Sequence, residues 1–331
     1  MTISQAADNV CKVSNVTTNH KEMKADANKE GISLNGNDCI IKPQVSLSSY
    51  TSYRVGGPAQ WYVAPRSNKS LQASVEYARE HELPITVLGA GSNLLVSDNG
   101  IPGLVIATRH MRYSDYDPET GRATFAAGES IPALAYAIAE RGWEGFEWAV
   151  GIPGTIGGAV VMNAGAHNSC IADILVSVEV LTPDGILQTM TREELNYSYR
   201  TSVLQGSNLI VTQATLQLQP GADPAEVTAT TKQHKKHRLA TQPYHLPSCG
   251  SVFRNPKPHS AGRLIEEAGL KGFKIGQAQV AQLHANFIVN CGGASANDVF
   301  NLIRHVQHQV QERWSIALHP EVKMLGEFQA A

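Results

Sequence analysis

Two glycine-rich loops constrain the fold of this chain more than any other feature. The first, Gly89-Ala-Gly-Ser-Asn93, follows an apolar strand-like run from Ile85 to Leu88. It matches the first half of the dinucleotide motif G-x-G-x-x-G, but Leu94 to Val96 form another strand-like run instead of a helix. A Rossmann loop must open a helix, so the Rossmann interpretation fails. Backbone N–H groups in such a loop can still face an anion such as a pyrophosphate, although a plain tight turn is the alternative.

The second loop, Gly151-Ile-Pro-Gly-Thr-Ile-Gly-Gly158, places four glycines and a proline in eight residues and continues through Ala159 to Asn163. Because glycine has no Cβ, an irregular backbone at this point can approach a flat ligand closely. Two separated loops of this kind in one domain indicate a single extended ligand that lies across both.

Composition excludes several classes of protein. Acidic and basic residues number 29 and 27 in 331, so the net charge of −2 gives no electrostatic basis for binding nucleic acid or a membrane surface. The apolar runs are too short to span a bilayer. Five cysteines without a C-x-x-C pair argue against a disulfide framework and a zinc site, and we expect no metal. There is no signal-peptide pattern, so we expect the cytoplasm.

Hydrophobic periodicity predicts ordered elements after a polar N-terminal stretch. Residues 1–40 hold six asparagines and no apolar period, which predicts a flexible extension, with a short docking arm as the alternative. The predicted helices cover residues 68–81, 132–141, 224–239, 260–269 and 297–313. The predicted strands cover 85–88, 94–96, 104–108 and 286–290, and residues 177–218 read as mostly strand. The Pro-Gly-Ala-Asp-Pro segment at 220–224 is the clearest domain boundary.

Ser251 and Arg200 are candidates for chemistry in the second half of the chain. Ser251 has no G-x-S-x-G elbow around it, so a hydrolase nucleophile is improbable. Its hydroxyl can instead donate a proton to a very strong base such as a carbanion, although a serine after glycine is usually just a turn. Arg200 lies in a polar break beside strands, where its planar guanidinium could grip a carboxylate or form a surface salt bridge.

Two further charged positions can also be explained without a function. Glu321 is a lone acid at the start of an apolar run, and a solvated strand end would explain it equally. Lys235 belongs to the basic run at 232–238, which is by default a solvated helix face. The same run could contact a substrate diphosphate.

Together these motifs resemble those of the UDP-N-acetylenolpyruvoylglucosamine reductases, also called UDP-N-acetylmuramate dehydrogenases. The resemblance covers about residues 45 to 326, and no single motif is decisive, but their number and order make it specific. The stretches are Arg54-Val-Gly-Gly-Pro-Ala59, Leu88-Gly-Ala-Gly-Ser-Asn-Leu-Leu-Val96, Gly151 to Gly158, Asn163-Ala-Gly-Ala166, Tyr199-Arg-Thr-Ser202, Gly250-Ser-Val-Phe-Arg-Asn-Pro256, Ala261 to Gly272, His284 to Asn290 and Pro320-Glu-Val322.

The resemblance implies an α+β fold in which a vanillyl-alcohol-oxidase/PCMH-type FAD-binding region of two subdomains precedes an α/β substrate-binding domain. The corresponding boundaries are 1–40 for the extension, 41–108 and 109–219 for the FAD-binding subdomains, and 220–331 for the substrate domain. It also implies non-covalent FAD, with NADPH as hydride donor. The implied reaction reduces UDP-N-acetylglucosamine enolpyruvate to UDP-N-acetylmuramate for the peptidoglycan of the cell wall. We expect a monomer.

The resemblance also assigns roles to individual residues. Ser251 resembles the proton donor, Arg200 the residue that stabilises the developing enolate charge, and Glu321 the residue that orients or tunes this cluster. Asn255, Tyr199 and Lys235 are expected at the substrate. The residues expected at FAD are Gly89, Ala90, Gly91, Ser92, Asn93, Gly151, Ile152, Gly154, Thr155, Gly157, Gly158, Ala159 and Asn163.

One departure and two rival functions complete the sequence-based interpretation. The family has a type with a Tyr-bearing insertion before the serine motif, and the short interval from Arg200 to Ser251 leaves no room for it. Tyr244 is therefore not assigned that role. A carbohydrate oxidase of the same flavin fold would not require Arg200, Ser251 and Glu321 together. An inactive nucleotide-sugar-binding protein would keep the glycine loops but gain nothing from Ser251.

Overall fold

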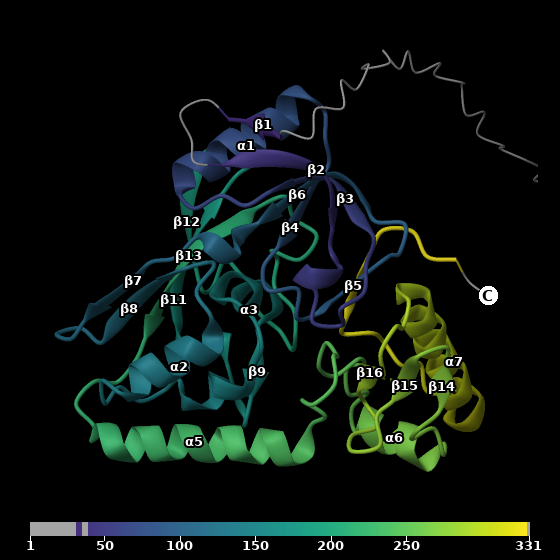
Figure 1. Cartoon of the computed structure of the whole chain (residues 1–331). Helices are drawn as coiled ribbons and strands as arrows, with labels where there is room; N and C mark the ends of the chain where they lie inside the picture. The colour runs from purple at the N-terminus through teal and green to yellow at the C-terminus, as the bar shows by residue number, and fades with distance from the viewer. Residues whose placement is uncertain (1–30, 35–38, 330–331) are drawn as a thin grey trace, which may run out of the picture. The chain divides into compact units, whose positions relative to one another are not determined.

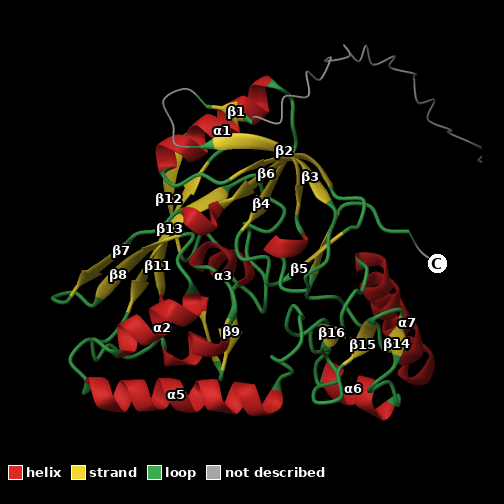
Figure 2. Ribbon diagram, viewed as in Figure 1, coloured by secondary structure: helices red, strands yellow, loops and turns green. Residues whose placement is uncertain are grey.

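The computed structural model describes residues 31–34 and 39–329 (Figures 1 and 2). Most of the flexible extension predicted for residues 1–40 lies outside these ranges. The described part of it is ordered, because strand β1 (Ile32–Ser33) pairs with strand β2 (Ile40–Ser46). Leu34 and Cys39 are buried in the apolar cluster beneath helix α1 (Asn68–Glu80). The ordered chain therefore starts earlier than the predicted boundary at residue 40.

The first sheet has the order β1-β2-β3-β6-β4. Strands β3 (Pro58–Val63), β6 (Ile101–Ala107) and β4 (Ile85–Leu88) are parallel, and β2 runs antiparallel to β3. Short 3-10 helices lie at η1 (Ser48–Tyr50) and η2 (Thr108–His110). Parallel pairing explains why β6 is an almost continuous apolar run, since such strands are buried on both faces.

Helix α1 connects β3 to β4 and confirms the helix predicted over residues 68–81. Ser67 caps its N-terminus through a reciprocal capping box with Ser70. Leu71, Val75 and Ala78 repeat at helical spacing and are buried against the sheet. The crossover places the end of β4, and the glycine loop that follows it, at one edge of this sheet.

The second sheet is antiparallel, with the order β12-β11-β13-β8-β7. Its strands are β7 (Ser114–Asp117), β8 (Arg122–Ala126), β11 (Leu175–Leu181), β12 (Leu187–Thr191) and β13 (Ile210–Gln217). The prediction of mostly strand over 177–218 is correct for β11, β12 and β13. It is wrong for residues 192–209, which form turns and a loop between β12 and β13.

Helices cover the second sheet. They are α2 (Ile131–Ala139), η3 (Glu147–Gly151), α3 (Ile156–Met162) and α4 (Ile171–Ile174), beside the small hairpin of β9 (Gly165–Ala166) and β10 (Ser169–Cys170). The second glycine loop is only partly irregular, because α3 begins within it. A Cβ on Gly157 would lie 2.9 Å from the Cβ of Ala127, so this glycine lets the helix pack closely on the segment after β8.

Helix α5 (Pro224–Thr241) confirms the helix predicted after the 220–224 break. This helix lies against η3 and α2, both of which precede the predicted boundary at 220, as Figure 1 also shows for α2. Only Val227 and Thr231 are buried on α5. The boundary at 220 stays a prediction.

The C-terminal part holds a third, antiparallel sheet of β14 (Lys274–Ile275), β15 (Ala278–Val280) and β16 (Ile288–Asn290). Helices α6 (Ala261–Glu267) and α7 (Ala296–Trp314) pack with it around one apolar cluster. The stripe predicted on the last helix is confirmed: Val299, Leu302, Ile303, Val306 and Val310 are all buried.

The end of the chain returns to the first subdomain. Strand β17 (Lys323–Leu325) pairs in parallel with β5 (Leu94–Val96), the strand that follows the first glycine loop. Glu321 is thereby placed next to that loop. No helix in the described ranges has the length and apolar character needed to cross a membrane.

Candidate active site

A cavity of about 1280 Å³ is lined by residues of the first two sheets and by loop residues of the C-terminal part, including Ser251 and Asn286. Ligand pockets commonly measure about 300–1,000 Å³, so this cavity has room for more than one small ligand. Most of the predicted site residues lie on its wall. Those on the wall are Gly89, Ala90, Gly91, Ser92, Asn93, Ile152, Gly154, Thr155, Gly157, Gly158, Ala159, Tyr199, Arg200, Ser251, Asn255 and Glu321.

The first glycine loop is held in place by its backbone. Gly91 has a φ of +65°, and its carbonyl oxygen accepts a hydrogen bond of 3.1 Å from the backbone N–H of Ser52. A Cβ at position 91 would collide with the backbone carbonyl oxygen of Tyr50. The positive φ and the close approach both require glycine here. The loop predicted from the sequence is thus a rigid feature of the cavity wall.

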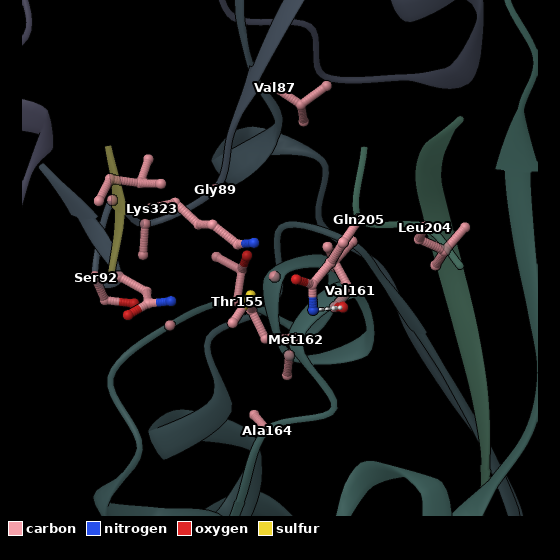
Figure 3. Close-up of a pocket in the computed structure, with 18 of the residues that line it drawn as sticks. Val87, Gly89, Ser92, Thr155, Val161, Met162, Ala164, Leu204, Gln205 and Lys323 are labelled. Atoms are coloured by element: carbon pink, nitrogen blue, oxygen red, sulfur yellow. Dashed lines mark hydrogen bonds between the residues drawn. The ribbon is translucent and has the colours of Figure 1, made fainter. Parts of the chain in front are cut away.

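The second loop meets the first across the cavity. The Ser92 hydroxyl donates a 2.8 Å hydrogen bond to the carbonyl of Pro153, which ties the two loops together. Gly158 lies on α3, and a Cβ there would meet only the Thr155 hydroxyl, at 3.7 Å. Figure 3 shows Gly89, Ser92 and Thr155 around this part of the cavity. The backbone is therefore exposed to a ligand on the α3 side.

Thr155 adds a polar group to this cradle. Its hydroxyl oxygen is buried and has no hydrogen-bond partner among the described residues. A Cβ on Gly89 would approach that oxygen to 2.7 Å, so glycine at 89 leaves the space beside it open. Bare backbone and an unused hydroxyl along an elongated cavity fit a dinucleotide such as FAD, which needs close approach and polar partners.

Arg200 and Glu321 form the charged centre of the cavity. Arg200 Nε donates to Glu321 Oε1 at 3.0 Å, and Nη2 donates to the Gly165 carbonyl at 2.8 Å. The two side chains are only 21% and 17% exposed. The alternatives of a surface salt bridge and a solvated strand end are therefore wrong, since the pair lies inside the cavity.

Burial raises the pKa of Glu321 above the ordinary range of a carboxyl group. The Arg200 guanidinium, and after it Arg254, oppose this shift by stabilising the carboxylate, but desolvation is the larger effect. Glu321 thus holds its proton more firmly than a carboxylate in water, although it has an arginine partner. A carboxyl group in this condition can take part in proton transfer.

Ser251 is brought to this pair by the backbone. The N–H of Glu321 donates to the carbonyl of Val252 at 2.7 Å, and Phe253 pairs with Pro320 in an isolated bridge. These backbone contacts therefore hold the serine loop and the Glu321 segment side by side. No hydrogen bond within the described part of the chain uses the Ser251 hydroxyl, so this group is available to a ligand.

The expected substrate contacts differ in their placement. Asn255 Oδ1 accepts from the N–H of Ala261 at 3.0 Å, which leaves the amide nitrogen for another partner. Tyr199 is 48% exposed, and the Arg200 guanidinium lies 5.0 Å from the centre of its ring. Lys235 does not reach the cavity wall, because its ammonium group lies over the ring of Tyr244.

Two expected cofactor contacts also lie off the wall. Asn163 is 5% exposed and has φ +45° at the C-terminus of α3, where its amide binds the Ser198 carbonyl and the N–H of Ala172. Asn163 thus stabilises the turn at the end of α3. Gly151 is covered by Arg238, and its carbonyl accepts a 2.6 Å hydrogen bond from Tyr244. Neither has a free polar atom facing the cavity.

Several wall residues were not found from the sequence. Leu204, Gln205 and Lys323 line the cavity beside Val161 and Met162 (Figure 3). The sequence did not predict that residues 204–211 line a site, because the pattern from 177 to 218 indicates mostly strand. In the described ranges, no group of three or more histidine, cysteine or acidic residues is arranged to hold a metal ion.

Comparisons with known proteins agree across the chain. A family model described as an FAD binding domain matches residues 59–191, and one described as UDP-N-acetylenolpyruvoylglucosamine reductase, C-terminal domain, matches residues 242–325. Proteins named UDP-N-acetylenolpyruvoylglucosamine reductase include one from Nostoc punctiforme, 71% identical over 100% of both chains. Another, from a Synechocystis species, is 55% identical over 90% of this chain and 94% of its own.

A solved structure gives the same result. The crystal structure of UDP-N-acetylenolpyruvylglucosamine reductase from Thermus caldophilus is 37% identical in sequence and has a TM-score of 0.74. The match covers 87% of this chain and 100% of that one. The likeness therefore extends over the cavity and the three sheets around it.

Proposed function

Because this chain belongs to the UDP-N-acetylenolpyruvoylglucosamine reductases, we propose that its cavity performs their reaction through Arg200, Ser251 and Glu321. The protein is an FAD-containing, NADPH-dependent oxidoreductase of peptidoglycan synthesis. It reduces UDP-N-acetylglucosamine enolpyruvate to UDP-N-acetylmuramate. The observation that carries the residue assignment is the 3.0 Å Arg200–Glu321 pair on the same wall as the unpaired Ser251 hydroxyl.

The glycine loops would hold the cofactor. Backbone groups at 89–93, the Thr155 hydroxyl and the exposed backbone at Gly154 and Gly158 would bind FAD without a covalent bond. When bound, FAD takes hydride from NADPH and supplies it to the enolpyruvyl double bond. The protein contributes alignment, exclusion of water and the proton.

Addition of hydride to one carbon of the enol ether leaves negative charge on the neighbouring carbon, next to the carboxylate. Arg200 would stabilise this charge as it develops, because its guanidinium is already fixed by Glu321 and the Gly165 carbonyl. Ser251 would donate its hydroxyl proton to that carbon. A hydroxyl is a weak acid, but a carbanion-like centre is a strong enough base to accept its proton.

Glu321 would orient Arg200 and share its proton with the site. Its raised pKa, caused first by burial, supports a part for this carboxyl group in proton transfer. Asn255 would contact the substrate through its free amide nitrogen, and Tyr199 through its exposed ring. We also propose that the enzyme acts in the cytoplasm, where NADPH and nucleotide sugars are made, and as a monomer, since one chain supplies every group named.

An anaerobic stopped-flow experiment tests this function. NADPH is added to the purified protein first and the enolpyruvyl sugar nucleotide second, while the flavin absorbance is followed. Bleaching by NADPH followed by recovery with the sugar nucleotide is the expected result. Bleaching without recovery would favour the oxidase, and a protein that cannot be reconstituted with FAD would favour the inactive binding protein.

A further inference from the structure

The backbone of Arg200 occupies an unfavourable conformation. Its φ is +57°, in the left-handed region, within a tight turn closed by paired hydrogen bonds of 3.1 Å between Ser198 and Thr201. A turn of this kind favours glycine at such a position. Strained residues persist only where the surroundings fix them, and they concentrate at functional sites. The direction of the Arg200 side chain thus depends on what fixes this turn.

Two side chains hold the carbonyl oxygen of Arg200. Gln205 Nε2 donates to it at 2.9 Å, and Arg254 Nη2 donates to it at 3.3 Å. The same Gln205 nitrogen also donates to the Val161 carbonyl at 3.1 Å, which is the bond drawn in Figure 3. Gln205 therefore ties the turn to the end of α3. Both hydrogens of its amide nitrogen are used within the protein.

Arg254 ties the same turn to the serine loop. Its backbone N–H donates to the His319 carbonyl at 3.0 Å, and its Nη1 donates to the Thr201 hydroxyl at 3.4 Å. Its Nε is buried without a partner among the described residues. Arg254, through its backbone N–H and its side chain together, therefore links the segment of Ser251, the segment of Glu321 and the turn of Arg200.

We propose that Gln205 and Arg254 are positioning residues that clamp the strained main chain of Arg200, so that its guanidinium faces Glu321 and the substrate. This inference rests on the proposed role of Arg200. Neither residue is assigned contact with the reacting atoms. Gln205 acts through the carbonyl of Arg200, and Arg254 acts through that carbonyl and through its charge.

Because Arg254 is charged, its loss should also have a second measurable effect, on the pKa of Glu321. The groups that face the Glu321 carboxyl are Arg200 from the turn, Arg254 from the serine loop and Cys249 from the same loop. Lys323 on β17 lies near Arg254. Both guanidinium groups stabilise the ionised Glu321, so loss of Arg254 raises its pKa further. Loss of the neutral Gln205 removes no charge, so it affects this pKa only as far as it displaces the Arg200 guanidinium.

The test compares Gln205→Met with Gln217→Met in the FAD-loaded enzyme. Gln217 is a matched control, because its Nε2 also donates to two carbonyls, those of Thr120 at 2.9 Å and Leu218 at 3.2 Å, away from the cavity. We expect Gln205→Met to slow recovery of the flavin absorbance by about 10- to 100-fold, as misplacement of a reacting group does. NADPH bleaching and FAD content stay as in the wild type, and Gln217→Met changes neither step.

A second pair of variants uses the pH dependence. In the pH profile of the rate of the second half-reaction, Arg254→Met should move the limb that depends on Glu321 to higher pH. Arg254→Lys should move this limb back towards its wild-type position without restoring the full rate. Gln205→Met should move the limb less than Arg254→Met, because it displaces Arg200 but removes no charge. A limb unchanged in Arg254→Met, or moved equally by Gln205→Met, would overturn the assignment.

The Arg200→Ala background separates clamping from direct contact. There, Gln205→Met should change the remaining rate by less than about 2-fold, because the residue it positions is gone. The same loss in both backgrounds would mean that Gln205 acts on the substrate itself. Loss of NADPH bleaching in Gln205→Met would also overturn the clamp. Normal turnover of Arg200→Ala alone would instead refute the proposed role of Arg200.

Discussion

Replacing Gly91 by alanine should lower the free energy of unfolding by far more than the addition of one methyl group would suggest. At a φ of +65°, an alanine pays about 1–2 kcal/mol for the left-handed conformation. Its Cβ would collide with the Tyr50 carbonyl oxygen and lie 3.0 Å from the Thr51 Cα, both backbone atoms that a rotamer change cannot move. Shifting a packed backbone costs about 1–3 kcal/mol, and losing the Ser52–Gly91 hydrogen bond about 1 kcal/mol more.

We therefore expect Gly91→Ala to lower the free energy of unfolding by about 3–6 kcal/mol. Gly185→Ala is the control, because Gly185 has a φ of +79° but a Cβ there would meet no atom within 4 Å. Gly185→Ala should lower the free energy of unfolding by only about 1–2 kcal/mol. Urea unfolding of the FAD-free proteins, followed by tryptophan fluorescence, measures both. Equal losses in the two variants would refute the steric argument.

Three further predictions follow from the cavity. Ser251→Ala should keep FAD and NADPH bleaching but slow the second half-reaction by about 10²–10⁴-fold in stopped flow; normal turnover would exclude the proton-donor role. Gly158→Ala should stabilise the FAD-free protein by up to about 1 kcal/mol, since Gly158 is helical, yet weaken FAD binding in a fluorescence titration, since its Cβ enters the cavity. Because burial raises the pKa of Glu321, this group stabilises the folded chain most at pH below its ordinary pKa, and the contribution is lost as pH rises through the folded pKa. The free energy of unfolding of Glu321→Gln, measured relative to wild type, should therefore increase as pH rises across that window; a constant difference would contradict the raised pKa.

The elements with a strong apolar period were predictable from the sequence. Helices α1 and α7 have one buried stripe each, and β4 and β5 are short apolar runs bounded by loop residues. Local patterns suffice there because the two helices each bury a single face and the two strands are short apolar runs with clear ends. Helix α3 was not predicted, since glycines are disfavoured in helices, and the close packing on Ala127 that requires Gly157 is a tertiary contact.

The candidate site was only partly predictable. The resemblance supplied Arg200, Ser251 and Glu321, but not the 3.0 Å ion pair between two residues 121 positions apart. Asn163 shows what a motif does not contain, because this residue has a structural part at the C-terminus of α3 and is not among the residues of the cavity wall, while its contact with FAD stays a prediction. Gln205 gave no signal at all, since its importance depends on the backbone conformation of another residue. Contacts of this kind arise from the tertiary fold, which a local pattern does not contain.

The pairing of β17 with β5 also has a consequence for how the enzyme is made. The Asn93 side chain donates to the Glu321 carbonyl across 228 positions, and the Lys323 N–H donates to the Asn93 carbonyl. The first glycine loop thus receives this neighbour only after residues 321–323 have left the ribosome. A chain that ended before residue 321 would contain every strand of the first two sheets but would lack the carboxylate of the site. Synthesis itself therefore delays activity until the last strand is in place.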